Sequence, residues 1–356
     1  MRDVDAVVLV GGKGTRLRPL TLSAPKPMLP TAGVPFLSHL LSRIADAGIT
    51  HVVLGTAYHA EVFERYFGDG AALGLEIEYV FEQEPLDTAG AIRNVYDRLR
   101  APDVIVFNGD ILSGADLGAL VERHRGSRAD VTLHLQRVAD PSRFGSVPTG
   151  DDGRVRAFLE KTPEPPTDQI NAGCYVFRRE VIGEIPDARP VSVERETFPG
   201  LLASGAHLQG FVDTSYWLDV GTPAAYVRGS TDLVRGLAPT SALPGEGGER
   251  LLLDSASVAA QAQVSGGSTV GAGATVGAGA RVHGSVLLDG ATVDERADVE
   301  GSVLGAGARV GAGTVLRGVV LGDGAVVGAD CELLDGARVW PGMRLPDGSV
   351  RFSSDI

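Results

Sequence analysis

The sequence is poor in cysteine and has no long apolar run. Its two cysteines, Cys174 and Cys331, lie far apart and have no metal-type spacing, which excludes a disulfide framework or a cysteine-based zinc site. We expect both thiols to be free, buried and kept reduced in the cytoplasm. No apolar run reaches the roughly 18 residues of a transmembrane helix, and the short run after Asp5 is too brief for a signal-peptide core.

The chain also lacks net positive charge. It carries 32 lysines and arginines against 45 aspartates and glutamates, a formal net charge of −13. Such a protein repels nucleic acid and anionic lipid at long range, so neither nucleic acid nor a membrane is an expected partner. Its seven histidines form no triad or metal spacing and are interpreted as structural. A polyanionic ligand would therefore need a local cluster of positive groups.

Residues 1–235 alternate strand and helix patterns. Continuous apolar strands separated by helices predict a mixed, mostly parallel sheet covered on both faces, which is a Rossmann-like α/β fold. In such sheets the ligand lies at the carboxyl ends of the strands. The predicted strands are 5–10, 51–55, 76–81 and 103–107, and the predicted helices are 35–47, 58–67 and 89–100.

Residues 236–250 are rich in proline, glycine and serine and are interpreted as a linker. From 251 to 356, branched apolar residues recur every six positions, as from Leu252 to Val282. A single five-residue step leads to Leu287, and the same short step precedes Leu304 and Leu321. This pattern is typical of a left-handed parallel β-helix with the apolar residue of each repeat inside. We expect this domain to support a homo-oligomer.

A glycine-rich loop follows the first predicted strand. Its sequence is Gly11-Gly12-Lys13-Gly14-Thr15-Arg16-Leu17-Arg18-Pro19-Leu20-Thr21, and Pro25-Lys26-Pro27 comes shortly after. Glycines let the backbone approach a bound group closely and turn N–H groups toward phosphate oxygens. The loop matches neither a Walker A motif nor the dinucleotide fingerprint. Arg16 and Lys26 supply the positive charge that a phosphate ligand needs; the alternative is a solvated surface loop.

On these two motifs the chain resembles the sugar-1-phosphate nucleotidyltransferase family, and within it the bacterial mannose-1-phosphate guanylyltransferases with a β-helix tail. The resemblance covers essentially the whole chain. Further motifs match in the same order: Glu84-Pro85-Leu86 with Thr88-Ala89-Gly90, Asn108-Gly109-Asp110, Phe144-Gly145, Glu160-Lys161, Ile170-Asn171-Ala172-Gly173, Ser192-Val193-Glu194-Arg195-Glu196-Thr197-Phe198-Pro199 and Trp217-Leu218-Asp219-Val220-Gly221.

The resemblance implies a reaction in which an oxygen of a sugar 1-phosphate attacks the α-phosphorus of GTP and displaces pyrophosphate. The nucleophile is already anionic, so positioning and electrostatics carry the catalysis. The implied cofactor is Mg²⁺, with Asp110 and Asp219 as its ligands. The implied catalytic residues are Arg16, Lys26, Asp110 and Asp219. The implied nucleotide-binding residues are Leu9, Gly11, Gly12, Gly14, Thr15, Arg16, Glu82, Pro85, Thr88 and Asp110. The implied sugar-phosphate residues are Gly109, Gly145, Glu160, Lys161 and Asn171.

Glu82 favours guanine over the other bases. Guanine offers two adjacent donors, N1–H and the 2-amino group, and a carboxylate can accept from both. Adenine and the pyrimidines lack this donor pair, which would cost about 1–3 kcal/mol. The family usually has glycine where this chain has Asp87, so Asp87 must tolerate any positive φ required there, which aspartate does better than most residues.

Three other functions are open at this point. The first is a thymidylyl-, uridylyl- or adenylyltransferase acting on glucose 1-phosphate, against which Glu82 argues. The second is a non-catalytic regulatory homologue, which would be expected to lose charged site residues that are present here. The third is a bifunctional enzyme with an acetyltransferase β-helix, which would need a histidine base and a long loop. The repeats hold only His283 and no long insertion.

Overall fold

The computed structural model describes residues 1, 3–12, 14–56, 60–159, 161 and 163–351. The chain forms two compact units. The first comprises Met1–Gly12 and Leu40–Trp217, and the second comprises Lys13–His39 and Leu218–Ile356. The N-terminal segment therefore contributes to both units, and the glycine-rich loop is divided between them after Gly12.

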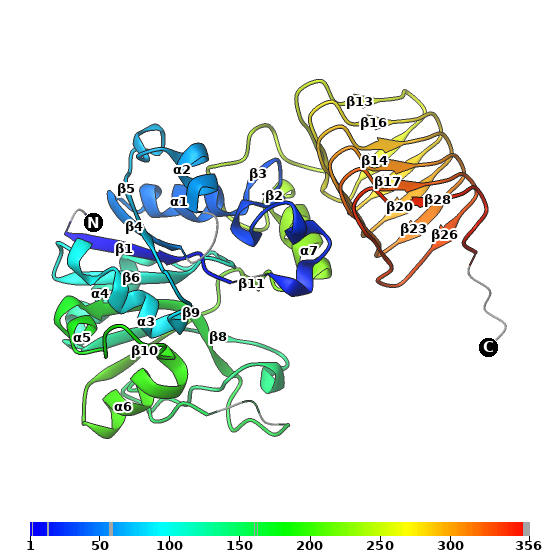
Figure 1. Ribbon diagram of the computed structural model, residues 1–356. Coiled ribbons are helices and arrows are strands. Elements are labelled where there is room, and N and C mark those ends of the chain that lie inside the picture. The colour runs from blue at the N-terminus through cyan, green and yellow to red at the C-terminus, as the bar shows by residue number, and fades with distance from the viewer. Residues whose placement is uncertain (2, 13, 57–59, 160, 162, 352–356) are drawn as a thin grey trace. The chain divides into compact units, whose positions relative to one another are not determined.

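The first unit is built on a seven-stranded sheet with the order β10-β8-β9-β6-β1-β4-β5 (Figure 1). Strand β9 runs antiparallel to β6 and β8, and the other neighbours pair in parallel. This confirms the predicted mixed, mostly parallel α/β sheet. Its strands are β1 Val4–Leu9, β4 His51–Thr56, β5 Glu76–Phe81, β6 Asp103–Asn108, β8 Val131–Arg137, β9 Gln169–Arg178 and β10 Leu208–Asp213.

The three predicted helices are present as α1, α2 and α3, although the ends of α1 and α3 differ from the prediction. The bounds are α1 Phe36–Asp46, α2 Ala60–Phe67, α3 Asp87–Asn94, α4 Leu117–Ser127, α5 Arg179–Gly183, α6 Phe198–Ala203 and, in the second unit, α7 Pro223–Val234. The predicted start at Tyr58 lies outside the described residues. The predicted helix 89–100 is wrong at its end. Helix α3 ends at Asn94, a 3-10 turn follows at Tyr96–Arg98, and Arg100 and Ala101 then donate their N–H groups to the Asp5 carboxylate.

Short strands complete the first 220 residues. They are β2 Pro30–Thr31, β3 Val34–Pro35, β7 Ile111–Ser113 and β11 Trp217–Asp219. Strands β2 and β3 form an antiparallel hairpin immediately before α1. Pro35 therefore ends a strand and does not begin the helix, so α1 starts one residue later than predicted.

The C-terminal repeats stack as a parallel β-helix of three sheets (Figure 1). This confirms the fold predicted from the six-residue repeats. The first sheet holds β12 Arg250–Leu252, β15 Ser268–Val270, β18 Val286–Leu287, β21 Val303–Leu304, β24 Val320–Leu321 and β27 Arg338–Val339. The second holds β13 Ser257–Val258, β16 Thr275–Val276, β19 Thr292–Val293, β22 Arg309–Val310, β25 Val326–Val327 and β28 Arg344–Leu345. The third holds β14 Gln263–Ser265, β17 Arg281–His283, β20 Asp298–Glu300, β23 Val315–Arg317 and β26 Glu332–Leu333.

The five-residue steps of the sequence lie at one corner of this helix. There the chain passes from the third sheet to the first through a glycine of positive φ, such as Gly284. The corner N–H groups are satisfied by stacked serines, since Ser268 Oγ accepts from Ser285 N and Ser285 Oγ accepts from Ser302 N. Each tighter corner thus repeats the hydrogen bond of the coil below it.

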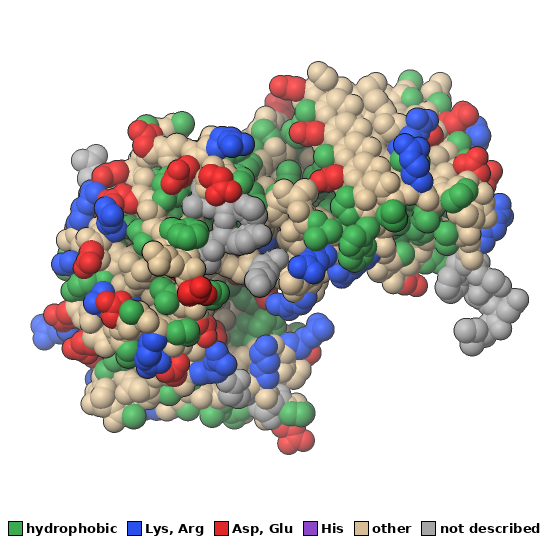
Figure 2. All heavy atoms as spheres, in the orientation of Figure 1, with side chains coloured by type: hydrophobic (Ala, Val, Ile, Leu, Met, Phe, Trp, Pro, Cys, Tyr) green, Lys and Arg blue, Asp and Glu red, His purple; other side chains and the backbone are tan. Residues whose placement is uncertain are grey.

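One predicted core position of the β-helix is exposed. Leu252 pairs with Val270, which is fully buried, yet Leu252 itself is 41% exposed. The physical reason is that Leu252 belongs to the first coil, which has a stacked coil on one side only. The inward residues of the following coils form one continuous apolar core, as predicted. Charged side chains cover only part of the visible face of the β-helix, and hydrophobic and other side chains cover the rest (Figure 2).

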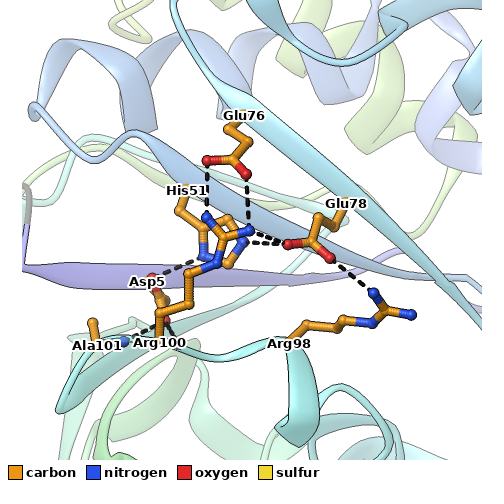
Figure 3. A network of polar contacts seen from close by, with 7 residues as sticks. All are labelled: Asp5, His51, Glu76, Glu78, Arg98, Arg100 and Ala101. Carbon is orange, nitrogen blue, oxygen red and sulfur yellow. Dashed lines mark hydrogen bonds and ion pairs between the residues drawn. The ribbon is translucent and has the colours of Figure 1, made fainter.

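A network of charged side chains, buried at Asp5 and His51 and exposed at Glu76 and Arg100, lies at the amino ends of β1, β4 and β5 (Figure 3). His51 Nδ1 lies 2.8 Å from Asp5 Oδ1, and His51 Nε2 lies 3.1 Å from Glu78 Oε1. Arg100 binds both Glu76 and Glu78. The hydrogen bond to Asp5 raises the pKa of His51, although burial opposes it. Burial alone would raise the pKa of Asp5, but hydrogen bonds from His51, Ala101 and Arg100 lower it overall.

Replacing His51 with glutamine is expected to reduce the free energy of unfolding more at pH 6 than at pH 9. A histidine whose pKa is raised on folding stabilises the folded protein. This stabilisation is complete below the ordinary histidine pKa of about 6.5, and it is lost as the pH rises through the pKa of the folded state. We expect the loss to be larger at pH 6, where the imidazolium bound to Asp5 is present in the folded protein. Urea unfolding at both pH values measures it, with His207→Gln as control. Equal losses at the two pH values would contradict the assignment.

Candidate functional site

The carboxyl ends of β1 and β6 lie beside each other in the first unit. Leu9 pairs with Asn108, and Gly109 N donates to Leu9 O at 2.9 Å. A Cβ atom on Gly109 would lie only 2.7 Å from Leu9 O, so a side chain there would push the two strand ends apart. Asp110 follows in the turn to β7. Three predicted site residues, Leu9, Gly109 and Asp110, are therefore gathered at the strand ends, opposite the Asp5 network.

The next two residues of the predicted nucleotide loop are exposed glycines. Gly11 and Gly12 follow β1, and Gly12 has a φ of 111°. This backbone conformation disfavours any side chain, and space for an incoming group is free around its Cα, where an added Cβ would meet no atom within 4 Å. The exposed backbone here has the character that phosphate binding requires.

Glu82 begins the segment that follows β5. Its side chain is buried, at 6% exposure, and Oε2 accepts from Leu86 N at 3.1 Å. Burial raises the pKa of this carboxyl, and the Leu86 hydrogen bond opposes that shift. Each carboxylate oxygen has two acceptor sites, so the bond to Leu86 leaves capacity for further donors. Pro85 lies in the exposed turn between them.

Asp87 has the conformation that its glycine counterpart would suggest. Its φ is 57°, in the left-handed region, and Oδ1 accepts from the following Thr88 N at 2.7 Å. Its other oxygen pairs with Arg195 at 2.8 Å. Thr88 Oγ1 in turn accepts from Val193 N at 2.8 Å. The segment after Glu82 is thus fastened to residues 193–195, which belong to one of the motifs of the sequence.

A cavity of about 210 Å³ contains three of the predicted sugar-phosphate residues, Gly145, Lys161 and Asn171. The remaining described lining residues are Phe144, Ser146, Val147, Phe158, Leu159 and Glu194. The predicted Glu160 lies outside the described residues. Lys161 is exposed at the cavity, where its ammonium group is available to an anion. The cavity therefore combines apolar walls with a few polar groups, the usual composition of a small-molecule site.

Asn171 is held in place by three hydrogen bonds. Its Nδ2 donates to Tyr175 Oη at 2.7 Å and to Glu194 Oε1 at 3.0 Å, and its Oδ1 accepts from Gly173 N at 3.0 Å. Tyr175 is fully buried and has a pKa raised by that burial, so it stays neutral. The Asn171 amide is consequently fixed in one orientation at the cavity wall.

Two polar lining residues, Ser146 and Glu194, were not predicted from the sequence. Glu194 lies in the matched motif Ser192–Pro199, which could have signalled it, but no role was assigned to it. Ser146 had no such signal. It is 1% exposed, and its hydroxyl has no hydrogen-bond partner within the described part of the chain. A buried hydroxyl costs free energy unless it is bonded, so a polar ligand group in the cavity would remove that cost.

The second unit carries the cationic part of the predicted loop. Gly14 has a φ of 55° and precedes a short 3-10 turn, Thr15–Leu17. The Gly14 carbonyl accepts from Thr21 Oγ1 at 2.8 Å, so the loop closes on itself. A Cβ on Gly14 would meet Thr21 Cγ2 at 2.9 Å and Lys26 Cβ at 3.2 Å. Lys26 therefore projects from beside Gly14, while Thr15 and Arg16 are exposed.

Arg16 lies close to Asp219 within the same unit. A Cβ atom built on Gly221 would lie 3.7 Å from Arg16 Cζ and 3.2 Å from Asp219 Oδ1, so both groups border the same glycine. A cation and a carboxylate that share this position suit a ligand carrying both phosphate oxygens and a metal ion.

Asp110 in the first unit and Asp219 in the second are the metal ligands that the sequence predicts. No group of three or more His, Cys, Asp or Glu side chains suited to a metal is found among the described residues. Mg²⁺ is usually bound by one or two carboxylates together with water and substrate phosphates, so such a group is not required for it.

Comparison with known proteins gives the family. Residues 5–236 match the nucleotidyl transferase family, described as "Nucleotidyl transferase", which covers well over half of the chain. The chain belongs to the nucleotidyl transferase family. Residues 247–353 match a second model, the "GMPPB C-terminal domain".

Two sequence relatives and one solved structure refine this family assignment. The chain is 64% identical over 355 residues to the mannose-1-phosphate guanylyltransferase of Mycobacterium tuberculosis, covering 99% of both chains. It is 38% identical to the mannose-1-phosphate guanylyltransferase catalytic subunit beta of Drosophila pseudoobscura pseudoobscura, over 63% of this chain and 61% of that one. HddC of Yersinia pseudotuberculosis, solved in complex with GMP-PN, has a TM-score of 0.57 and 29% identity, covering 64% of this chain and 99% of HddC.

As a nucleotidyl transferase, the protein belongs to a family that generally uses a divalent metal ion. Both cysteines are free and buried, as predicted. Within the described ranges, no helix has both the length and the apolar character needed to cross a membrane.

Proposed function

We propose that this nucleotidyl transferase transfers the guanylyl group of GTP to mannose 1-phosphate, giving GDP-mannose and pyrophosphate. The observation that carries the proposal is the 64% identity over 355 residues with a mannose-1-phosphate guanylyltransferase. The buried Glu82 carboxylate and the cavity lined by Lys161 and Asn171 support it from the structure.

The reaction brings together two anions, which requires positive charge at the phosphates, and the lysines of the chain lie in the motifs proposed to bind them. Its three lysines, Lys13, Lys26 and Lys161, all lie in the phosphate-binding motifs, and every other cation among its 32 Lys and Arg residues is an arginine. Lys161 holds the sugar phosphate, Lys26 acts near the transferred phosphorus, and Arg16 stabilises the β- and γ-phosphates. An oxygen of the sugar phosphate attacks the α-phosphorus, the bond to the bridging oxygen breaks, and pyrophosphate leaves. Since the nucleophile is already anionic, the side chains align and neutralise and need not remove a proton.

The backbone of Gly11, Gly12, Gly14 and Thr15 faces the phosphates, with Leu9 beneath them. The base lies against Pro85 and Thr88, and the Glu82 carboxylate accepts from N1–H and the 2-amino group of guanine. Gly109, Gly145, Glu160 and Asn171 bind the sugar, and the fixed Asn171 amide gives its hydroxyls a defined partner.

Mg²⁺ is the proposed cofactor, held by Asp110 and Asp219 and by phosphate oxygens. When bound it would neutralise charge on the phosphates during transfer. We further propose that the catalytic part spans residues 1–235, the linker 236–250 and the β-helix 251–356, that the protein works in the cytoplasm, where nucleoside triphosphates are made, and that the β-helix supports a homo-oligomer.

Pyrophosphate release, measured for GTP, dTTP, UTP and ATP in combination with mannose and glucose 1-phosphates, tests the function. GTP with mannose 1-phosphate is expected to have the highest kcat/KM, by about tenfold or more over any other pair. A preference for dTTP, UTP or ATP with glucose 1-phosphate would replace the proposal by the corresponding nucleotidyltransferase. Absence of release with every pair would favour a non-catalytic regulatory homologue.

A further inference from the structure

The outer faces of the three β-helix sheets differ in burial. In the first sheet, one outward column runs through paired residues of successive coils. Its members are at most 2% exposed, although it is the next residue of each strand, Val270, Leu287, Leu304 and Leu321 among them, that fills the interior of the β-helix. These outward residues are Leu251, Thr269, Val286, Val303 and Val320. Outward residues of the second sheet, such as Thr275 and Arg309, are exposed. The first sheet is therefore covered by other parts of the second unit.

Helix α7 covers one end of this column. Ser230 Oγ lies 3.4 Å from Thr269 Oγ1, and a Cβ on Gly267 would lie 2.6 Å from Thr231 O. The hairpin of β2 and β3 reaches the preceding coil, since a Cβ on Gly33 would meet Leu253 at 2.9 Å. Helix α7 is therefore in close backbone contact with the second coil, and the hairpin contacts the first coil.

The other end of the column carries a charge. Val320 pairs with Arg338, which breaks the apolar series on the last coil of the first sheet. Arg338 Nη1 donates to the main-chain carbonyl of Arg18 at 2.7 Å. Arg18 caps the 3-10 turn Thr15–Leu17, and its N–H group donates to Thr15 O. Leu17 and Leu20 on either side are nearly fully buried.

We propose that Arg338 is a positioning residue for the phosphate loop, so that the last coils of the β-helix hold Arg16 in the direction that triphosphate binding requires. The loop segment Gly14–Thr21 is closed at its start by the bond from Thr21 to the Gly14 carbonyl. The bond from Arg338 holds the middle of this segment at the Arg18 carbonyl, two residues beyond Arg16. A hydrogen bond from a guanidinium to a carbonyl is charge-assisted and directional, which suits this task. The β-helix thus acts on the reaction as well as on assembly.

Arg344 provides a matched control for Arg338. It ends the equivalent outward column of the second sheet, through Val326, and it is exposed on β28. The same substitution at both positions removes one surface arginine from neighbouring terminal strands. Only the Arg338 change removes the bond to Arg18.

The test measures kinetics of full-length Arg338→Ala, Arg338→Lys and Arg344→Ala with the triphosphate and sugar phosphate that the parent uses best. For Arg338→Ala we expect kcat/KM for the triphosphate to fall about fivefold, with KM for the sugar phosphate within about twofold, since one partly exposed charged bond is lost. Lysine should restore part of the loss, and Arg344→Ala should match the parent. Thermal melting accompanies each variant, and Arg338→Gln replaces the alanine variant if that one is poorly folded.

The proposal is overturned if Arg338→Ala or Arg338→Gln behaves like Arg344→Ala, or if KM for both substrates rises equally. It rests on the proposed function only for the role of Arg16. A parent enzyme that prefers another substrate pair would disprove guanylyl transfer, whereas the comparison of the two arginines would still decide the positioning role.

Discussion

Replacing Asp110 with asparagine is expected to reduce turnover by about a thousandfold or more, because the proposed metal site loses one of its two protein carboxylates. Asp110 follows Gly109, whose close contact with Leu9 O fixes the turn at the end of β6. Asparagine keeps the size and one oxygen of the side chain but lacks the negative charge. The fold should therefore be preserved while the affinity for the divalent ion falls.

Steady-state pyrophosphate release over a titration of Mg²⁺ measures the effect. Asp116→Asn is the matched control, since Asp116 caps α4 by accepting from Ala119 N, and asparagine caps equally well. We expect the control to retain nearly full activity. Near-normal rates of Asp110→Asn in saturating Mg²⁺ would remove Asp110 from the metal site.

Features of the fold that follow from a simple period could be predicted from the sequence. Continuous apolar runs gave β1, β4 and β6 because strands covered on both faces bury every side chain. The six-residue repeats predicted the β-helix because one inward-facing residue recurs in each short strand. The five-residue steps before Leu287 and Leu304 lie at the corner where the chain turns more tightly. In both cases burial maps directly onto spacing along the chain.

Features that depend on a distant partner could not be predicted in this way. The helix predicted at 89–100 does not reach Arg100, because the N–H groups of Arg100 and Ala101 donate to the Asp5 carboxylate, far away in sequence. Leu252 fits the repeat but lies on an end coil. From the sequence, Arg338 is indistinguishable from any other exposed arginine. Its proposed role follows only from its hydrogen bond to the Arg18 carbonyl in the structure.

The candidate site shows the same division. Loop residues such as Gly109 follow from strand ends, where a fold of this class gathers its ligands. By contrast, Ser146 could not be predicted because a single serine in an irregular segment forms no pattern. Its significance comes from burial without a hydrogen-bond partner in the described part of the chain. Asp87 is intermediate. Its position suggested a positive φ, which the structure has, but its pairing with Arg195 needed the three-dimensional arrangement.

Glu82→Gln is expected to change the choice of base by about 10- to 100-fold, measured as the ratio of kcat/KM for GTP to that for UTP or dTTP. The carboxylate accepts from two adjacent donors of guanine, whereas a glutamine amide presents one acceptor and one donor and meets the 2-amino group with the wrong polarity. Because Glu82 is buried, a mismatched donor there has no water to bond instead. Leu86 N can still donate to the glutamine oxygen, so the loop is expected to keep its shape.

The pH dependence separates base recognition from a loss of structure. Burial raises the pKa of Glu82, so its carboxyl takes up a proton at a higher pH than an exposed glutamate does. Protonation removes the second acceptor, and KM for GTP in the parent should therefore rise as the pH is lowered toward that pKa. Glutamine does not titrate, so KM for GTP in the variant should not show this rise at low pH. Changes in KM that other titrating groups cause should remain. Glu84→Gln, two residues along in the exposed turn, is the control. An unchanged base preference together with an unchanged pH profile would show that guanine is read elsewhere.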